Sequence, residues 1–228
     1  MRCGILEAGT ATRNRGALFG YRRCFARTVT KARFMSIAHA QAVLDFWFGA
    51  PGSATHGQWR DAWFRKDAAF DAEIAQRFGP VVETALAGGL RDWTAAPGTA
   101  LARVVLLDQF TRNMFRDIPR AFGGDALALE AAQAMVTAGH DRGLDPVLRS
   151  FVYLPFEHAE SAAMQAESVR LFTALADESP ALHHMLDYAH RHRDVIVRFG
   201  RFPHRNAVLG RSATAAELAF LSQPGARF

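Results

Sequence analysis

From Ala38 onward, apolar residues recur at intervals of three and four positions, and no segment alternates strictly between apolar and polar residues. This spacing gathers apolar side chains on one face of an α-helix, whereas a half-buried strand requires alternation. Half of the 228 residues are apolar, which is sufficient for the core of a single domain. We therefore expect an all-α fold.

The pattern predicts about ten helices joined by short connections. They cover residues 39–48, 57–65, 67–78, 80–87, 99–116, 125–140, 146–156, 161–176, 180–199 and 215–221. Pro80, Pro146 and Pro180 stand at predicted first turns, where proline is tolerated. Short connections favour antiparallel neighbours, so we expect antiparallel helical hairpins stacked on one another. No repeat of about 34 residues is visible in the sequence, so any repeat character must be structural.

Helix termini have clear signals towards the C-terminus. Asp125 and Thr214 are candidate N-caps, and Thr214 with Glu217 has the spacing of a capping box. Gly200 is placed to end the helix before it in a left-handed conformation, with Pro203 following. We expect the chain to continue from there in an extended segment to Asn206.

The basic charge of the chain is confined to its first 34 residues. These contain eight Arg or Lys and one acid, a charge of +7, and the remainder has nineteen basic and twenty-one acidic residues, a charge of −2. A nucleic-acid-binding surface on the folded part is therefore disfavoured. We expect residues 1–34 to be a basic extension, either disordered, a targeting peptide or sequence upstream of a true start at Met35, and residues 35–228 to form a single all-α domain.

The cysteines also lie in that extension, at Cys3 and Cys24. The main domain consequently has no thiol for a disulfide, a cysteine nucleophile or a thiolate zinc site. The extension has no apolar run long enough for a secretory signal or a membrane span. We expect a cytoplasmic protein without a membrane partner.

The segment RFGRFPHRN, residues 198–206, is the densest polar motif. Arg198, Arg201 and Arg205 stay charged at any accessible pH, and a guanidinium fork matches carboxylate or phosphate oxygens. One arginine can satisfy the end of the preceding helix, but three, with His204 and Asn206, exceed that need. The others require internal acids such as Asp108, Glu157 and Glu160, or an external anion.

The helix containing LARVVLLDQFTRNMFR changes from apolar to polar at its middle. Asp108 and Arg112 are spaced to pair at i, i+4, and Gln109, Arg112, Asn113 and Arg116 form a second polar stripe. This is either a solvated helix end with a surface ion pair or a polar patch partly enclosed by the fold.

The segment FVYLPFEHAES ends its apolar run at Glu157, His158 and Glu160. Two acids beside a histidine can hold an arginine, transfer protons or bind a metal, although an ordinary helix terminus has the same composition. A metal site would gather His158, Glu160, His190 and His204, but a di-metal bundle needs two Glu-x-x-His pairs and only Asp187–His190 has comparable spacing. We expect no metal and no cofactor.

Several familiar catalytic motifs are absent, including Gly-x-Ser-x-Gly, the phosphate-binding loop, Gly-x-Gly-x-x-Gly and His-Glu-x-x-His. Lys66 is the only lysine beyond the extension, so Schiff-base chemistry has almost no candidate.

The blocks LDFWFG, LLDQFTRNMFR, LPFEHAES, HRDVIVRFGRFPHRN and LGRSATAAELAFL together resemble the bacterial domain of unknown function 924 family, over residues 44–221. The resemblance implies a tetratricopeptide-like right-handed stack of helices and no established activity. At Ala159 the chain departs from the family pattern, which has a serine before the glutamate.

Our leading hypothesis is a site for a small anion, a phosphate or carboxylate, where the three polar segments meet. It requires guanidinium groups that share one recess with too few internal carboxylates. The candidate ligand-binding residues are Asp108, Arg112, Asn113, Arg116, Arg201, Arg205 and Asn206, and the candidate acid–base residues are His158, Glu160 and His204. If the protein is an enzyme, a hydrolase or transferase is expected. The alternatives are a helical-repeat module that binds an acidic peptide, and a purely structural ion-pair network.

Overall fold

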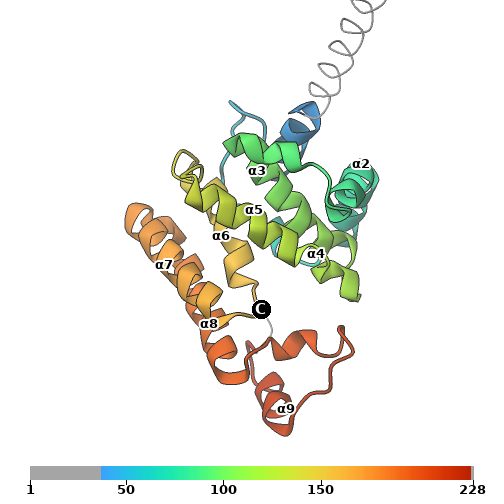
Figure 1. Ribbon diagram of the computed structural model, residues 1–228, viewed down its shortest axis with the longest axis vertical. Helices are drawn as coiled ribbons and strands as arrows, with labels where there is room; N and C mark the ends of the chain where they lie inside the picture. The colour runs from blue at the N-terminus through green and yellow to red at the C-terminus, as the bar shows by residue number, and fades with distance from the viewer. Residues whose placement is uncertain (1–36, 227–228) are drawn as a thin grey trace, which may run out of the picture. The chain divides into compact units, whose positions relative to one another are not determined.

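The computed structural model describes residues 37–226, and these residues form helices and turns without a β-strand. The expected all-α fold is therefore confirmed for the described part of the chain (Figure 1). A first helix ends at residue 48, and the elements that follow are η1 (Asp61–Trp63), α2 (Ala68–Leu86), η2 (Arg91–Ala95), α3 (Pro97–Val104), η3 (Val105–Phe110), α4 (Thr111–Met114), η4 (Pro119–Phe122), α5 (Asp125–Thr137), α6 (Pro146–Glu157), α7 (Ala162–Glu178), η5 (Pro180–Leu182), α8 (His183–Phe199), η6 (Pro203–Arg205) and α9 (Ala215–Leu221).

Helices that follow one another in sequence pack together. α5 contacts α6, α6 contacts α7, and α7 contacts α8, while α3 lies against α5. The main core consists of buried aromatic and aliphatic residues from the first helix through α8, with Trp47, Phe110 and Phe151 among those with no more than 1% of their surface exposed. None of the described helices is both long and apolar enough to cross a membrane.

The predicted helices over residues 67–78 and 80–87 form a single helix, and the helix predicted over residues 57–65 is not an α-helix. α2 continues through Pro80, which we expected to begin a new helix. Gly79 precedes it and has no Cβ to collide with the proline ring, and this reduces the strain of an internal proline. Residues 57–65 form turns and the short 3₁₀ helix η1 instead of a helix.

The termini were predicted with mixed success. The capping box of Thr214 and Glu217 is confirmed, and Gly200 has the expected left-handed conformation with φ of 70°. Asp125 is not an N-cap: Gly124 occupies that position and Asp125 is the first residue of α5. The segment after Gly200 is not extended throughout, because η6 forms at Pro203–Arg205.

A second, smaller apolar cluster anchors this last segment. Phe202 is fully buried and packs with Val195 and Ile196 of α8, while Phe199 contacts Phe220 of α9. These aromatic anchors fix the backbone of residues 200–206, and so the polar side chains between them have defined directions.

Candidate functional site

The polar half of the long central helix is enclosed by the fold. α3, η3 and α4 form one continuous helical run in which η3 is a π-helical turn. Asp108, Gln109 and Asn113 are each no more than 5% exposed. Of the two alternatives for this helix, the polar patch partly enclosed by the fold is therefore confirmed, and the solvated helix end is wrong. A π-turn adds a residue to one turn, and such turns are frequent at functional sites.

A close approach between two helices positions the next element. A Cβ added at Gly124 would lie 2.1 Å from the carbonyl oxygen of Leu107 in the π-turn, so only glycine fits there. The start of α5 therefore lies directly against η3. This contact places Asp125 beside Arg112.

Asp108 is the buried centre of the site. Its Oδ1 lies 2.8 Å from His158 Nδ1 and 3.1 Å from Arg112 Nη1, and its Oδ2 accepts a 2.6 Å hydrogen bond from Gln109. Burial alone would raise the pKa of Asp108, but the charges of Arg112 and His158 and the hydrogen bonds from His158 and Gln109 outweigh it. The pKa of Asp108 consequently lies well below its ordinary range, and the group is a carboxylate.

His158 is the C-cap residue of α6 and faces Asp108 from the other side. Burial and the positive charge of Arg112 lower the pKa of His158, and the Asp108 carboxylate offsets this only in part. The ring is therefore neutral at pH 7. Its Nδ1–H donates to Asp108, so Nε2 has the free lone pair.

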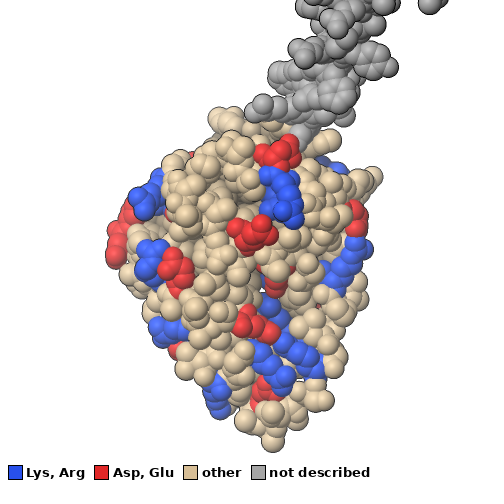
Figure 2. Space-filling model, in the orientation of Figure 1, with Lys and Arg blue, Asp and Glu red and all other residues tan. Residues whose placement is uncertain are grey.

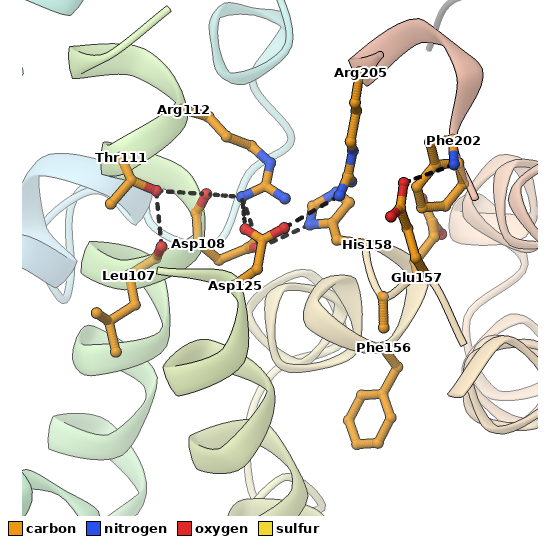
Figure 3. Close-up of polar contacts among 12 residues, drawn as sticks. Leu107, Asp108, Thr111, Arg112, Asp125, Phe156, Glu157, His158, Phe202 and Arg205 are labelled. Atoms are coloured by element: carbon orange, nitrogen blue, oxygen red, sulfur yellow. Dashed lines mark hydrogen bonds and ion pairs between the residues drawn. The ribbon is translucent and has the colours of Figure 1, made fainter. Parts of the chain in front are cut away.

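Asp125 joins two arginines from distant parts of the chain (Figure 3). Its Oδ1 accepts from Arg112 Nη1 at 3.0 Å, and its Oδ2 accepts from Arg205 Nη1 at 3.2 Å. The guanidinium of Arg205 lies between the rings of Phe122 and Phe202, 4.7 and 4.5 Å from their centroids. Burial and the charge of Arg112 lower the pKa of Arg205 to about 10. The two guanidiniums thus meet at one carboxylate.

Arg201 belongs to a neighbouring pair. It makes two hydrogen bonds to the buried carboxylate of Glu217, at 2.7 and 2.9 Å, and one to the carbonyl of Ser212. Hydrogen bonds from Arg201 and from the Thr214 backbone lower the pKa of Glu217 to about 2, and Asn206 contributes to the same shift. The side chains of Arg201 and Asn206 are therefore held at Glu217, in the first turn of α9.

Glu160 holds the segment after α8, but through an arginine that we did not predict. Its carboxylate accepts hydrogen bonds from two nitrogens of Arg211 and from the backbone N–H of Phe202. Arg211 also donates to Asn206 Oδ1 at 3.0 Å and to the Phe202 carbonyl. Arg211 stands in the LGRS block that carries the family resemblance, and this was the available signal.

Asn113 and Arg116 point away from this group. Both bind the carboxylate of Asp71 in α2, Asn113 at 2.8 Å and Arg116 through two nitrogens. This pairing ties α4 to α2. Arg198 has a different environment again, since its guanidinium stacks on the ring of Phe199 at 4.8 Å.

Glu157, which we expected as a possible counter-ion for the arginines, is instead a second buried acid near Asp108. Burial, with a further contribution from Asp108, raises the pKa of Glu157 to about 8. Its Oε1 lies 3.2 Å from Nδ1 of His192, whose pKa burial lowers to about 3. Both groups are neutral at pH 7, so their contact is not an ion pair. His204 is also neutral, because burial and Arg205 lower its pKa to about 4.

The expectation of too few internal carboxylates is wrong. Arg112, Arg201, Arg205 and Arg211 each contact a carboxylate, and the four acids involved are Asp108, Asp125, Glu160 and Glu217. Figure 2 shows basic and acidic side chains intermixed in the lower half of the visible face. Two hydrogen-bond donors of these arginines nevertheless lack an acceptor: Arg112 Nη2 and Arg205 Nε are buried and make no hydrogen bond within residues 37–226.

A family model described as a bacterial protein of unknown function, DUF924, matches residues 43–225. A solved structure, a protein of unknown function named ATU0120 from Agrobacterium tumefaciens, is 38% identical in sequence. The alignment covers 82% of this chain and 98% of that one, with a TM-score of 0.73. A comparison with curated proteins finds no match.

Proposed function

We propose that this chain, which belongs to the DUF924 family of bacterial proteins of unknown function, binds a small carboxylate or phosphate between Arg112 and Arg205, beside His158. The expected anion site is thereby reduced to the residues that meet at Asp125. Asn113, Arg116, Arg201 and Asn206 are not assigned to it, because each is held at another acid or at the start of α9.

One observation carries the proposal: a single carboxylate, that of Asp125, presents one oxygen to each of two guanidiniums. This is the arrangement in which a bound anion would lie between two arginines. The buried N–H groups of Arg112 Nη2 and Arg205 Nε make no hydrogen bond within the described residues. Buried donors without an acceptor are unfavourable by about 1–3 kcal/mol each, so an incoming oxygen atom would be stabilised there.

Asp125 is suited to give up its place. Its side chain is 23% exposed, and it is the first residue of α5, where the helix dipole favours a negative charge. The preceding N-cap, Gly124, offers no side-chain acceptor to the first turn of the helix. A displaced Asp125 carboxylate would therefore remain stabilised near free backbone N–H groups.

The histidines beside the two arginines would make anion binding depend on pH. The pKa values of His158, His192 and His204 are all lowered, in part because of the arginines. An anion between Arg112 and Arg205 would offset that repulsion and raise the pKa of His158. Binding would then take up a proton, and affinity would increase as the pH falls.

We also propose how the helices around the site are stacked. We propose that the successive contacts of α5 with α6, α6 with α7 and α7 with α8 form a tetratricopeptide-like stack of antiparallel hairpins within one domain covering residues 35–228, in a cytoplasmic protein. The predicted basic extension, residues 1–34, lies outside the described residues.

The experiment is a thermal-shift series with succinate, citrate and inorganic phosphate at constant ionic strength. An anion at a hundred times its dissociation constant stabilises by about 2.7 kcal/mol, or about 5 to 10 °C in Tm for a chain of this size. Arg112→Gln and Arg205→Gln are expected to lose this response. Arg170→Gln is the matched control, since Arg170 forms an exposed pair with Glu167 on α7. No shift with any of the three anions, or an equal shift in the two site variants, would contradict the proposal.

A further inference from the structure

We infer that His158 is a general base that activates water, and that the protein hydrolyses an ester whose free carboxylate is held by Arg112 and Arg205. This inference rests on the anion site proposed above and adds a reaction to it. It is carried by the geometry of His158 and Asp108 relative to the two arginines.

The Asp108–His158 pair has the arrangement of an oriented base. A 2.8 Å hydrogen bond joins His158 Nδ1 to Asp108 Oδ1, which fixes the tautomer and directs the Nε2 lone pair away from the acid. Asp108 cannot turn, because Gln109 and Arg112 hold it and its side chain is 1% exposed. His158 retains 15% exposure, and the charges of Arg112 and Arg205 both act on its ring.

The Asp108–His158 pair and the anion site are joined by Arg112. Arg112 contacts Asp108 and Asp125 with the same nitrogen, Nη1, so the anion bound in place of Asp125 would lie one guanidinium away from the dyad. A substrate held there by its carboxylate would have its other end within reach of His158. Fixing both reactants in this way is the main contribution that a binding site makes to a hydrolysis.

Water is the nucleophile that the composition leaves available. Among residues 37–226 Lys66 is the only lysine and there is no cysteine, and no serine is among the residues that meet at Asp108 and Asp125. A covalent acyl intermediate on such a side chain is therefore not part of the inference.

His158 alone carries out both proton transfers of the hydrolysis. Nε2 takes a proton from water as the water oxygen bonds to the ester carbonyl carbon, giving a tetrahedral oxyanion. The bond from that carbon to the leaving oxygen then breaks, and the imidazolium returns the proton to the leaving alkoxide. The products are a carboxylic acid and an alcohol, and no oxidant or reductant is consumed. Arg112 Nη2 makes no hydrogen bond within the described residues and has two N–H groups, so one can hold the substrate carboxylate while the other donates to the oxyanion.

The groups that face His158 come from every element packed around it. Asp108 of η3, Arg112 of α4, His192 of α8, and His204 and Arg205 of η6 act on the ring directly, and Gln109, Asp125 of α5 and Glu157 of α6 contact those residues in turn. The net effect is a lowered pKa for His158, with burial as its main cause. We expect kcat/KM, which reports the free protein, to rise with pH to a plateau with an apparent pKa below 6.5, the ordinary value for histidine, and kcat to have a higher apparent pKa because the bound carboxylate raises that of His158.

The test compares two chromogenic esters with the full chain: 4-nitrophenyl hydrogen succinate, which has a free carboxylate, and 4-nitrophenyl butanoate, which has none. We expect kcat/KM to be at least about tenfold higher for the succinate ester, and His158→Gln to lower it by about a hundredfold or more. Arg205→Gln should remove the preference for the succinate ester. His183→Gln is the control, because His183 is exposed on α8.

Two results separate this inference from the anion site. A succinate-dependent rise in Tm without hydrolysis faster than that by free imidazole would overturn the catalytic role and leave the binding site intact, whereas loss of both would overturn the two together. A second measurement needs no substrate. Nitrogen-15 NMR of the histidine rings at pH 7 should show His158 neutral with its proton on Nδ1, and a proton on Nε2 would refute the assignment.

Discussion

Replacing Asp125 with asparagine gives the sharpest separation between an anion site and a purely structural network. Asp125 is the acid that contacts both Arg112 and Arg205, and asparagine has nearly the same shape without the charge. Arg112 keeps Asp108, but Arg205, with only 7% of its side chain exposed, loses its carboxylate contact. The substitution therefore leaves a buried cation unpaired.

The expected loss of stability follows from that burial. Breaking a buried ion pair lowers the free energy of unfolding by about 3–5 kcal/mol, and the lower value applies because Asp125 is partly exposed. A loss of about 3 kcal/mol corresponds to a fall of about 6–12 °C in Tm for a chain of this length. Succinate or phosphate at a hundred times its dissociation constant would return about 2.7 kcal/mol and restore most of this loss.

The assay is calorimetric unfolding with and without the anion at constant ionic strength, on wild type and Asp125→Asn. Asp125→Asn should respond to lower anion concentrations than wild type, because no internal carboxylate competes for the arginines. Asp177→Asn, an exposed aspartate on α7, is the matched control and should behave as wild type. An Asp125→Asn protein that loses stability but gains no more from anions than wild type would refute the reasoning and favour the structural network.

Three further predictions use other parts of the molecule. Gly124→Ala should lower the free energy of unfolding by about 3 kcal/mol, because the added Cβ would overlap the Leu107 carbonyl oxygen. Gly143→Ala is the control, since no atom lies near its Cβ. Equal unfolding curves for the two variants would show that α5 and η3 can separate to admit the methyl group. Glu157 ionises near 8 in the fold and at the ordinary 4.5 when unfolded, so it lowers stability as the pH rises; below 6.5 the buried His158, His192 and His204, which are protonated only when unfolded, act in the opposite direction. Wild-type stability should therefore fall between pH 6.5 and 8, by up to about 1.4 kcal/mol per unit. Glu157→Gln should flatten that slope, and an unchanged slope in urea titrations would mean that Glu157 is ionised in the fold. Arg201→Ala should lower Tm, because Glu217 is buried, while the Tm response to succinate stays at the wild-type value; a reduced response would place Arg201 in the anion site.

Local signals in the sequence predicted the parts of the fold that depend on neighbours along the chain. The capping box at Thr214 and the left-handed turn at Gly200 were predicted because each is defined within a few residues. The pairing of Asp108 with Arg112 was predicted from i, i+4 spacing and is confirmed at 3.1 Å. The π-turn that contains Asp108 has no sequence signature of this kind, so it could not be predicted.

The partners of the arginines could not be predicted, because they come from residues far apart in sequence. Arg205 meets Asp125 across 80 positions and Arg211 meets Glu160 across 51. Asp125 was assigned to capping α5, a sound local reading that failed because Gly124 must approach Leu107 closely. Tertiary packing therefore decided which acid each arginine would contact.

The attachment of the segment from Gly200 to Arg211 would let the proposed anion site open without unfolding the segment. Phe202 is fully buried in its own apolar cluster, and its backbone N–H donates to Glu160, which also holds Arg211. Neither contact involves Asp125. Exchange of the Asp125 carboxylate for a ligand would therefore break one ion pair of Arg205 while the aromatic and Glu160 contacts keep η6 in place. The ring of Phe202 would continue to support the guanidinium of Arg205, so that the cation is already oriented when the anion arrives.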